Sequence, residues 1–437
     1  MTKKIMALFC SIVLLLALMP AGAAEAKTGV PSLSRKNIKV KEEETETLSV
    51  NANGAEVKKV TWKSSDPKSA TVESNGKLSA VVTGVRNGYA YITVQVTYIQ
   101  GGRTVNERLS CYVDVKWGER AAILKFNKDK TRVVGIANRI HATYVEIPDG
   151  VTSIGDRVFL SCERLTKVSI PDSVTSIGNE AFRYCTWLET IDIPDSVTRI
   201  GDSAFEQCYG LTSIKLPDGI THIGKKTFWG CRKLPQIEIP DGVTSIGKEA
   251  FYNCEVLAEV AMPDSVVSIG DGAFNICAYL TDIDMSVVTS IGRYAFNDCD
   301  CLVDIDLSSA AKIGYGAFSN CDGLVHVDLP DGIKSTGDYA FQNCINLTSI
   351  SIPDSLTRIG KGAFSYCRSL TQIEIPDGVT RIGPEAFSYC QGLTQVTVPD
   401  SVTRIGDSAF YRCDSLTYIT WGQVTCSKTD RDYAYLW

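Results

Sequence analysis

Apolar and polar residues alternate in short segments along most of the chain. In residues 188–208, the segment LETIDIP places apolar and polar side chains in turn. This period of two predicts a short strand with Ile191 and Ile193 facing inward and Thr190 and Asp192 facing outward.

The rest of this unit predicts two further sides. Residues 194–196 (PDS) favour a turn, because proline presets φ and cannot donate a backbone hydrogen bond. Val197 and Ile200 return to the core on a second side, and Gly201 permits a backbone bend. Phe205 anchors a third side, which we expect to be a short helical turn. One unit cannot bury three faces alone, so the units must stack into a solenoid.

The same unit recurs twelve times with a period of 23 residues, except for two steps of 22. The Ile of its Ile-Gly pair is residue 154, 177, 200, 223, 246, 269, 291, 313, 359, 382 and 405, with Thr336 filling the remaining place. Phe follows five residues later and Cys three after that in every unit, from Phe159 and Cys162 to Phe410 and Cys413. At a strand spacing of about 4.8 Å, twelve units form a face roughly 55–60 Å long.

The chain before the repeats has a different pattern. Residues 57–62 and 89–96 alternate with period two, and Asn75-Gly76 is a turn signal between strand-like runs. This spacing predicts a small all-β sandwich. We divide the chain as follows: signal peptide 1–26, small β domain 27–117, degenerate capping repeat 118–144, repeat solenoid 145–421 and C-terminal tail 422–437.

The first residues have the pattern of an export signal. A short basic start precedes an apolar run over residues 5–19, and small residues then end at Ala26. Cleavage after Ala26 or after Ala23 fits the pattern, and an uncleaved anchor is the alternative. With no second apolar stretch, we expect no transmembrane segment after signal removal and a secreted or cell-surface location.

An ordered series of residues in the first domain resembles the bacterial Ig-like domain of group 2. The series is Trp62-Lys-Ser-Ser-Asp66, Ala70-Thr-Val72, Asn75-Gly-Lys-Leu78, Ala80 and Gly84. The resemblance implies a spacer or adhesion module without catalytic residues. Glu43 or Glu44 stands where this family usually has glycine.

The repeats resemble the BspA-like (treponemal-type) leucine-rich repeat over about residues 145–421. The resemblance implies an exported bacterial surface protein associated with adhesion to host proteins or to other cells. It implies no enzyme activity and no fixed site residues.

The twelve repeated cysteines invite a metal or disulfide interpretation, which their spacing disfavours. Equivalent residues of stacked units lie about 4.8 Å apart, more than the roughly 3.8 Å between the Cβ atoms of a disulfide. We expect a buried column of thiols that donate weakly to turn carbonyls. Cys111, Cys301 and Cys426 stand outside this column, and their pairing stays open.

Composition narrows the possible functions. The chain has 22% charged residues, a net charge of −6 and only three histidines. A nucleic-acid partner is disfavoured by the acidic balance, and no hydrolase, metalloprotease or phosphate-binding motif appears. We expect no enzyme activity and no cofactor. The mild net charge conceals an uneven distribution: residues 27–118 hold 14 basic and 9 acidic residues (+5), and residues 119–437 hold 28 and 40 (−12).

Carboxylates concentrate at the outward strand positions in the middle of the array. The candidate binding residues of this acidic strand face are Glu238, Glu259, Asp282, Asp284, Asp304, Asp306, His326 and Asp328. The two 22-residue repeats fall in the same region, because Met285-Ser286 and Leu307-Ser308 replace the Pro-Asp turn. Like charges on adjacent strands destabilise a sheet. The concentration of carboxylates at this place therefore favours a binding role for them.

Three interpretations of this face remain open. It binds a basic segment of a partner, it holds Ca²⁺ through Asp282, Asp284, Asp304 and Asp306, or it reflects variation among solvated repeats. A second line of charge is a short basic ridge of Arg358, Arg381 and Arg404, which could contact anionic glycans or envelope polymers.

The sequence thus favours an exported, non-enzymatic binding protein. We expect a cell-surface or secreted adhesin that uses the solenoid face to bind a host or bacterial surface protein or glycan. The alternative is a structural envelope protein that self-associates. The oligomeric state stays open.

Overall fold

A computed structural model of the chain describes most of its residues, and these divide into two compact units, with the boundary in the sequence after residue 118. The described residues are 29–85, 88–116, 120–422 and 424–427. The predicted signal peptide lies outside them. Each unit has its own hydrophobic core.

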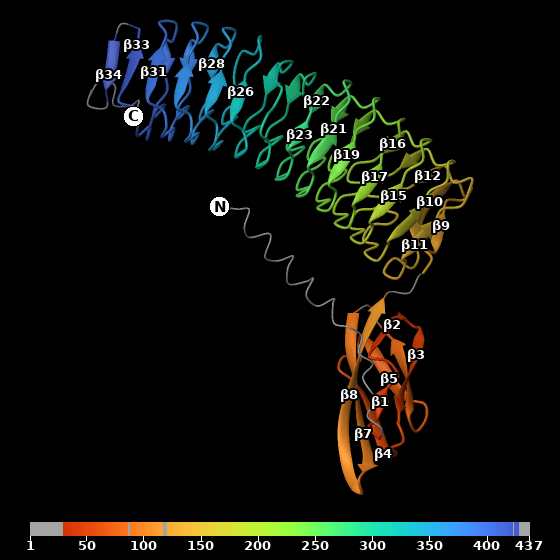
Figure 1. The fold of residues 1–437 in the computed structure, drawn as a ribbon. Coiled ribbons are helices and arrows are strands. Elements are labelled where there is room, and N and C mark those ends of the chain that lie inside the picture. Colours follow the sequence, from red (N-terminus) through yellow and green to blue (C-terminus); the bar gives the residue numbers. More distant parts are fainter. Residues whose placement is uncertain (1–28, 86–87, 117–119, 423, 428–437) are drawn as a thin grey trace. The chain divides into compact units, whose positions relative to one another are not determined.

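The first unit is a two-sheet β-sandwich, as predicted (Figure 1). One sheet has the order β1-β3-β6-β5 and the other β2-β8-β7-β4, with all pairs antiparallel except β2 and β8. The strands are β1 (Ser32–Leu33), β2 (Asn37–Lys41), β3 (Thr45–Asn51), β4 (Glu56–Ser64), β5 (Ala70–Ser74), β6 (Ser79–Gly84), β7 (Gly88–Gln100) and β8 (Arg103–Lys116). Glu43 has φ +67°, so it occupies a left-handed position that favours the glycine usual in the Ig-like family.

The second unit is a solenoid of about 13 turns, here called coils, whose strands stack side by side in a curving array (Figure 1). It contains parallel strands about 23 residues apart, which confirms the predicted fold class. Each coil has three faces: a long-strand face, a short-strand face and a turn face.

The long-strand face carries the predicted alternation, with outward side chains exposed and the central one buried in most coils. Its strands are β11 (Tyr144–Glu146), β13 (Lys167–Ser169), β15 (Thr190–Asp192), β17 (Ser213–Lys215), β19 (Gln236–Glu238), β21 (Glu259–Ala261), β23 (Asp282–Ile283), β26 (His326–Asp328), β27 (Ser349–Ser351), β29 (Gln372–Glu374), β31 (Gln395–Val398) and β33 (Tyr418–Trp421). Hydrogen-bonded pairing is interrupted between β13 and β15, β17 and β19, β23 and β26, and β27 and β29.

The short-strand face carries the Ile of each Ile-Gly pair, which is buried throughout. Its strands are β12 (Ser153–Ile154), β14 (Ser176–Ile177), β16 (Arg199–Ile200), β18 (His222–Ile223), β20 (Ser245–Ile246), β22 (Ser268–Ile269), β24 (Ser290–Ile291), β25 (Lys312–Ile313), β28 (Arg358–Ile359), β30 (Arg381–Ile382) and β32 (Arg404–Ile405). The two ends of the array carry antiparallel pairs: β9 (Leu124–Phe126) with β10 (Arg132–Ile136), and β33 with β34 (Val424–Ser427).

The recurring glycine is required by close stacking. The φ of Gly201 is not positive, so this position needs glycine for space and not for a left-handed conformation. A Cβ added there would lie 2.5 Å from the backbone nitrogen of Asn179 in the preceding coil. Only a residue without a side chain lets adjacent coils approach so closely.

The turn face differs from its prediction. The sequence suggested a helical turn around Phe205, whereas the structure has consecutive β-turns and no helix there. Ser203 and Gln207 flank this Phe with φ +56° and +60°, and the same two positions are left-handed in later coils. This geometry turns the Phe205 N–H toward the Thr227 carbonyl of the next coil, at 2.9 Å.

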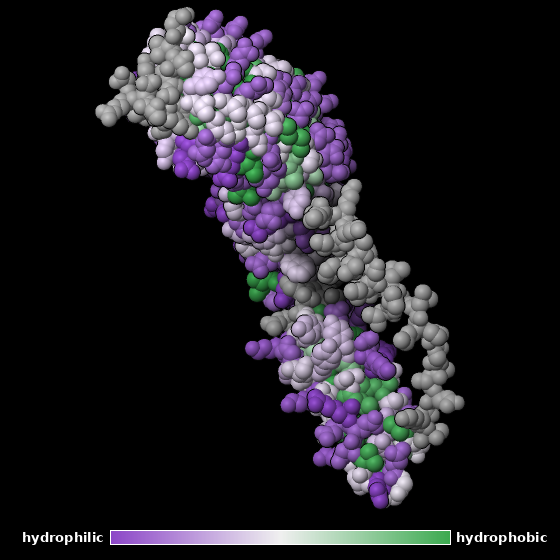
Figure 2. All heavy atoms as spheres, turned by 60° about the vertical axis from the view of Figure 1, so that its left-hand side comes forward, coloured by the Kyte–Doolittle hydropathy of each residue, from purple (hydrophilic) through white to green (hydrophobic). Residues whose placement is uncertain are grey.

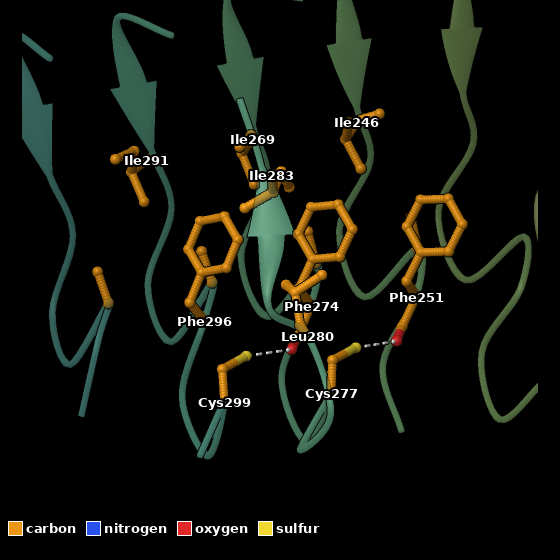
Figure 3. Packing of buried hydrophobic residues seen from close by; sticks show 14 of the residues in the cluster. Ile246, Phe251, Ile269, Phe274, Cys277, Leu280, Ile283, Ile291, Phe296 and Cys299 are labelled. Atoms are coloured by element: carbon orange, nitrogen blue, oxygen red, sulfur yellow. Dashed lines mark hydrogen bonds between the residues drawn. The ribbon is translucent and has the colours of Figure 1, made fainter. Parts of the chain in front are cut away.

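Two of the buried columns in the array core are formed by the repeated Phe and Cys residues (Figure 3). The twelve Phe rings stack with centroids 5.0–5.7 Å apart and planes within 15° of parallel. Beside them, each thiol from Cys185 to Cys413 donates to the carbonyl of a Phe in the preceding coil at 3.0–3.3 Å. The expected thiol column is therefore present, and no disulfide joins the cysteines that the structure describes.

Candidate binding surface

The structure gathers the eight predicted acidic-face residues on one exposed surface, here called the mid-array acidic surface. Glu238, Glu259 and Asp282 project from β19, β21 and β23, and His326 and Asp328 from β26. Asp284, Asp304 and Asp306 are also exposed but lie outside any strand.

One expected strand is absent from this surface. Residues 304–306 form no strand, and β23 has only two residues. The Asp304 carboxylate accepts a hydrogen bond from the Ile305 N–H at 2.9 Å. Aspartate side chains that bond to nearby backbone compete with strand pairing in this way.

Asp284 and Asp306 have a structural role in the two shortened coils. The Asp284 carboxylate accepts a hydrogen bond from the Ser286 N–H at 2.9 Å, and Asp306 accepts one from Ser308 at 2.8 Å. The bond from Ser286, helped by its side chain, holds the pKa of Asp284 below its usual value. These carboxylates fix turns that proline fixes in the regular coils.

Apart from Asp328, which bonds to His326, the other carboxylates of this surface have no cationic partner within the described structure. Glu259 and Asp282 are neighbours in register on β21 and β23. Ion pairs with Lys or Arg form at other acidic residues of the array, as at Glu180 and Glu249. The negative charge is therefore left uncompensated by the fold.

The negative charge extends to the corner between the turn face and the long-strand face. Burial, followed by repulsion from Asp322 and Asp298, raises the pKa of Asp300 above its usual value. Burial and Asp298 raise the pKa of Asp322, whose Oδ1 is buried without a hydrogen-bond partner.

The Ca²⁺ interpretation receives no support from the geometry. Among the residues that the structure describes, no group of three or more His, Cys, Asp or Glu is placed to hold a metal ion. The four candidate ligands, Asp282, Asp284, Asp304 and Asp306, therefore do not gather into a coordination site, and two of them hold turns instead.

His326 is part of a hydrogen-bonded chain that sequence reasoning missed. Its Nδ1 lies 2.7 Å from the Ser349 Oγ and its Nε2 lies 2.9 Å from the Asp328 carboxylate. Hydrogen bonds from Ser351 and then His326 lower the pKa of Asp328. The His326 and Asp328 side chains are 48% and 71% exposed, so this group lies in water and not in a water-excluding active site. The 23-residue period, which places residues 326 and 349 side by side, was the available signal.

Exposed apolar side chains occur in the same coils as the acidic surface, and the sequence analysis did not identify them. Val256, Tyr279, Val303 and Val325 are 39%, 60%, 54% and 44% exposed. Val303 and Val325 directly precede Asp304 and His326, at a position where Thr348 and other coils carry threonine. Areas of hydrophobic surface interrupt the hydrophilic surface of the array in Figure 2. We call these four residues the mid-array apolar strip.

The surface also contains hollows. One of about 430 Å³ is lined in part by Lys215, Glu238 and Glu259, where β17 and β19 are not paired. A larger one of about 860 Å³ lies further along the same face, around β29 and β31.

The three arginines of the basic ridge are adjacent. Arg358, Arg381 and Arg404 are in register on β28, β30 and β32. Arg358 pairs with Asp338 at 2.9 Å, while Arg381 and Arg404 are exposed.

The fold and this surface define a leucine-rich-repeat protein with an Ig-like module. The model for the BspA-type leucine-rich repeat region matches residues 137–232, 221–344 and 289–417, and the model for the bacterial Ig-like domain (group 2) matches residues 31–105. The chain belongs to the BspA-type leucine-rich repeat family. Proteins of this fold are typically non-enzymatic binding proteins, so membership is consistent with a binding or adhesion role.

Two solved structures are similar to the chain. A leucine-rich cell surface protein from Faecalibacterium prausnitzii A2-165 is 32% identical, and the match covers 73% of this chain and 97% of that one, with a TM-score of 0.50. A leucine-rich repeat protein from Bacteroides ovatus is 28% identical, and the match covers 69% and 94%, with a TM-score of 0.59. No protein with a curated description matches the chain. Within the described residues, the structure contains no helix that is long and apolar enough to span a membrane.

Proposed function

We propose that the chain is an exported adhesin that binds a protein partner through the mid-array acidic surface and the mid-array apolar strip. Uncompensated charge beside exposed apolar side chains carries this proposal. Carboxylates without cationic partners favour a basic ligand, and exposed apolar residues gathered in neighbouring coils favour an interaction site. The partner segment therefore combines basic and apolar side chains and belongs to a host or bacterial surface protein.

The charge contribution is tested with Asp282→Asn/Asp304→Asn, which spares the turn-forming Asp284 and Asp306. The matched control is Glu146→Gln/Asp192→Asn, two outward carboxylates of distant coils. Both variants and the wild type are measured against a panel of immobilised extracellular-matrix and bacterial envelope proteins. We expect the first variant to lose about tenfold in affinity at low salt, with the difference shrinking as salt rises.

The apolar contribution is tested with Val303→Thr/Val325→Thr, which installs the residue that other coils carry. We expect weaker binding at both low and high salt, because burial of apolar area is not screened by ions. Thr348→Val is the control. Unchanged affinity in both the charge and the apolar variants would contradict the proposal.

Opposite charges on the two units favour a second function, self-association into a structural layer. Residues 27–118 carry +5 and residues 119–437 carry −12. Contact between the basic unit of one copy and the acidic array of another would weaken with salt. Light scattering over a range of protein and salt concentrations tests this, and a monomer under all conditions would argue against it.

The basic ridge supports a further contact with anionic polymers. Arg381 and Arg404 place exposed guanidinium groups in a row, which suits repeated phosphate, sulfate or carboxylate groups. Binding to an anionic polymer such as dextran sulfate, compared with an Arg381→Gln/Arg404→Gln variant, tests this contact.

A further inference from the structure

The larger hollow of the long-strand face lies where the strand ladder is open. β27 and β29 are consecutive on this face, yet they are not hydrogen-bonded to each other. Buried Ile350, Ile373 and Val398 contribute to the lining of the hollow, whose volume is about 860 Å³. This volume falls within the range of roughly 300–1,000 Å³ that is typical of small-molecule sites.

The polar lining offers paired donors and acceptors. Gln372 and Gln395 are neighbours in register on β29 and β31, and both side chains are exposed. Each primary amide both donates and accepts hydrogen bonds. Thr394 and Thr397 add hydroxyl groups to the same wall.

The charged groups of the lining are all acceptors. Glu374, Asp377 and Asp400 line the hollow, and none of the described residues that line it is basic. A carboxylate can accept hydrogen bonds from two adjacent hydroxyl groups, and it repels an anion. These carboxylates form no metal-binding group within the described structure.

From this donor and acceptor set we propose that the hollow binds a neutral oligosaccharide. Vicinal hydroxyl groups of a sugar match the carboxylates, and further hydroxyl groups match the two amides as donors and acceptors. Ile419 is in register with Val396, so Tyr418, the residue before it, lies beside Gln395. The Tyr418 side chain is 44% exposed. Tyr418 does not itself line the hollow, but its exposed ring offers an aromatic surface on the strand that follows β31. This site is separate from the mid-array acidic surface, so it goes beyond the proposed function.

The test titrates the full chain with cellotetraose, xylotetraose, mannotetraose and maltotetraose, followed by calorimetry and ligand-observed NMR. We expect at least one of them to bind and Gln372→Ala/Gln395→Ala to weaken that binding about tenfold or more. The matched control is Gln236→Ala, which removes a glutamine of the same column at the smaller hollow. Circular dichroism checks that each variant is folded.

Each other outcome overturns the proposal. It fails if none of the four neutral sugars binds, if the double variant binds as well as the wild type, or if Gln236→Ala weakens binding equally. It also fails if tetralysine or tetragalacturonate binds at this hollow in place of a neutral sugar. Asp282→Asn/Asp304→Asn is expected to leave sugar binding unchanged, so failure here and failure of the protein-binding proposal are distinguishable.

Discussion

Ile276 occupies a backbone conformation that suits few side chains. Its φ is +61°, and β-branched residues are strongly disfavoured in the left-handed region. Asn253, Asn320 and Asn343 occupy the same position in other coils, and asparagine tolerates it best after glycine. The array therefore holds Ile276 in place through its neighbours.

We expect Ile276→Asn to raise the free energy of unfolding of the array by about 0.5–1 kcal/mol, because it relieves this backbone cost. Chemical denaturation followed by circular dichroism measures the change. The reverse exchange, Asn253→Ile, is the control and lowers stability by a similar amount. Destabilisation by Ile276→Asn would show that the buried part of the Ile side chain matters more.

The column thiols are predicted to be unreactive in the folded protein. Burial raises the pKa of Cys208 and Cys254 to about 12, and the thiolate is the reactive form. At pH 8 the fraction of thiolate is therefore small, and it stays small until the pH approaches the raised pKa. Iodoacetamide labelling with mass spectrometry is expected to modify half-buried Cys301 first and the column only after unfolding in urea. Equal native labelling of Cys254 and Cys301 would contradict this.

At the scale of the elements, the strands could be predicted and the turn face could not. Alternating residues such as Thr190 and Ile191 identify a strand directly. Left-handed positions are normally recognised from glycine or asparagine, whereas here they carry residues such as Tyr184 and Ile276. The turn-face geometry is set by hydrogen bonds to the next coil, which a local pattern does not contain.

The candidate surface divides in the same way. The acidic columns follow from the period, because residues 23 apart lie side by side, as Glu238 does with Ala261. The loss of the strand at Asp304 and the hollows depend on how neighbouring coils pair, and that pairing varies between coils of almost the same sequence. The apolar strip could not be predicted, because Val303 resembles a core residue in the sequence. Only the exposed fraction of its side chain in the structure shows that it lies on the surface.

The acidic corner of one coil predicts a pH dependence. The pKa of Asp322 is raised in the folded protein, so the folded state favours the protonated carboxyl group. This contribution to stability is present at low pH and is lost as the pH rises through the raised pKa. At pH 7, Asp322→Asn should therefore raise the unfolding midpoint by about 1 °C, and the gain should shrink toward zero at acidic pH. Thermal melts from pH 3 to 8 measure this, with the exposed Asp192→Asn as control. A gain that does not depend on pH would assign the effect to packing.

At the scale of the molecule, contacts between neighbouring coils hold the array together. Adjacent coils share the Phe stack, the thiol bonds and the turn-face bonds. Stability in such arrays is approximately a sum over neighbouring units. Removing one whole coil should therefore leave a folded array.

We expect deletion of residues 361–383 to preserve the fold, because it joins Gly360 to Pro384 at equivalent positions of two coils. Circular dichroism and limited proteolysis should show a folded array with a slightly lower unfolding midpoint. Deletion of residues 361–372, about half a coil, is the control and should break the register of every following coil. A folded half-coil variant, or an unfolded whole-coil variant, would contradict the expectation.

The turn-face hydrogen bonds give every coil the same donor edge and the same acceptor edge. Any coil can therefore follow any other, and a gene that encodes such a chain can gain or lose whole repeats by unequal recombination without losing its product. The number of coils then becomes a trait on which selection acts. A bacterium could alter what this protein recognises by shuffling a few acidic or neutral coils, while the buried columns keep the architecture constant.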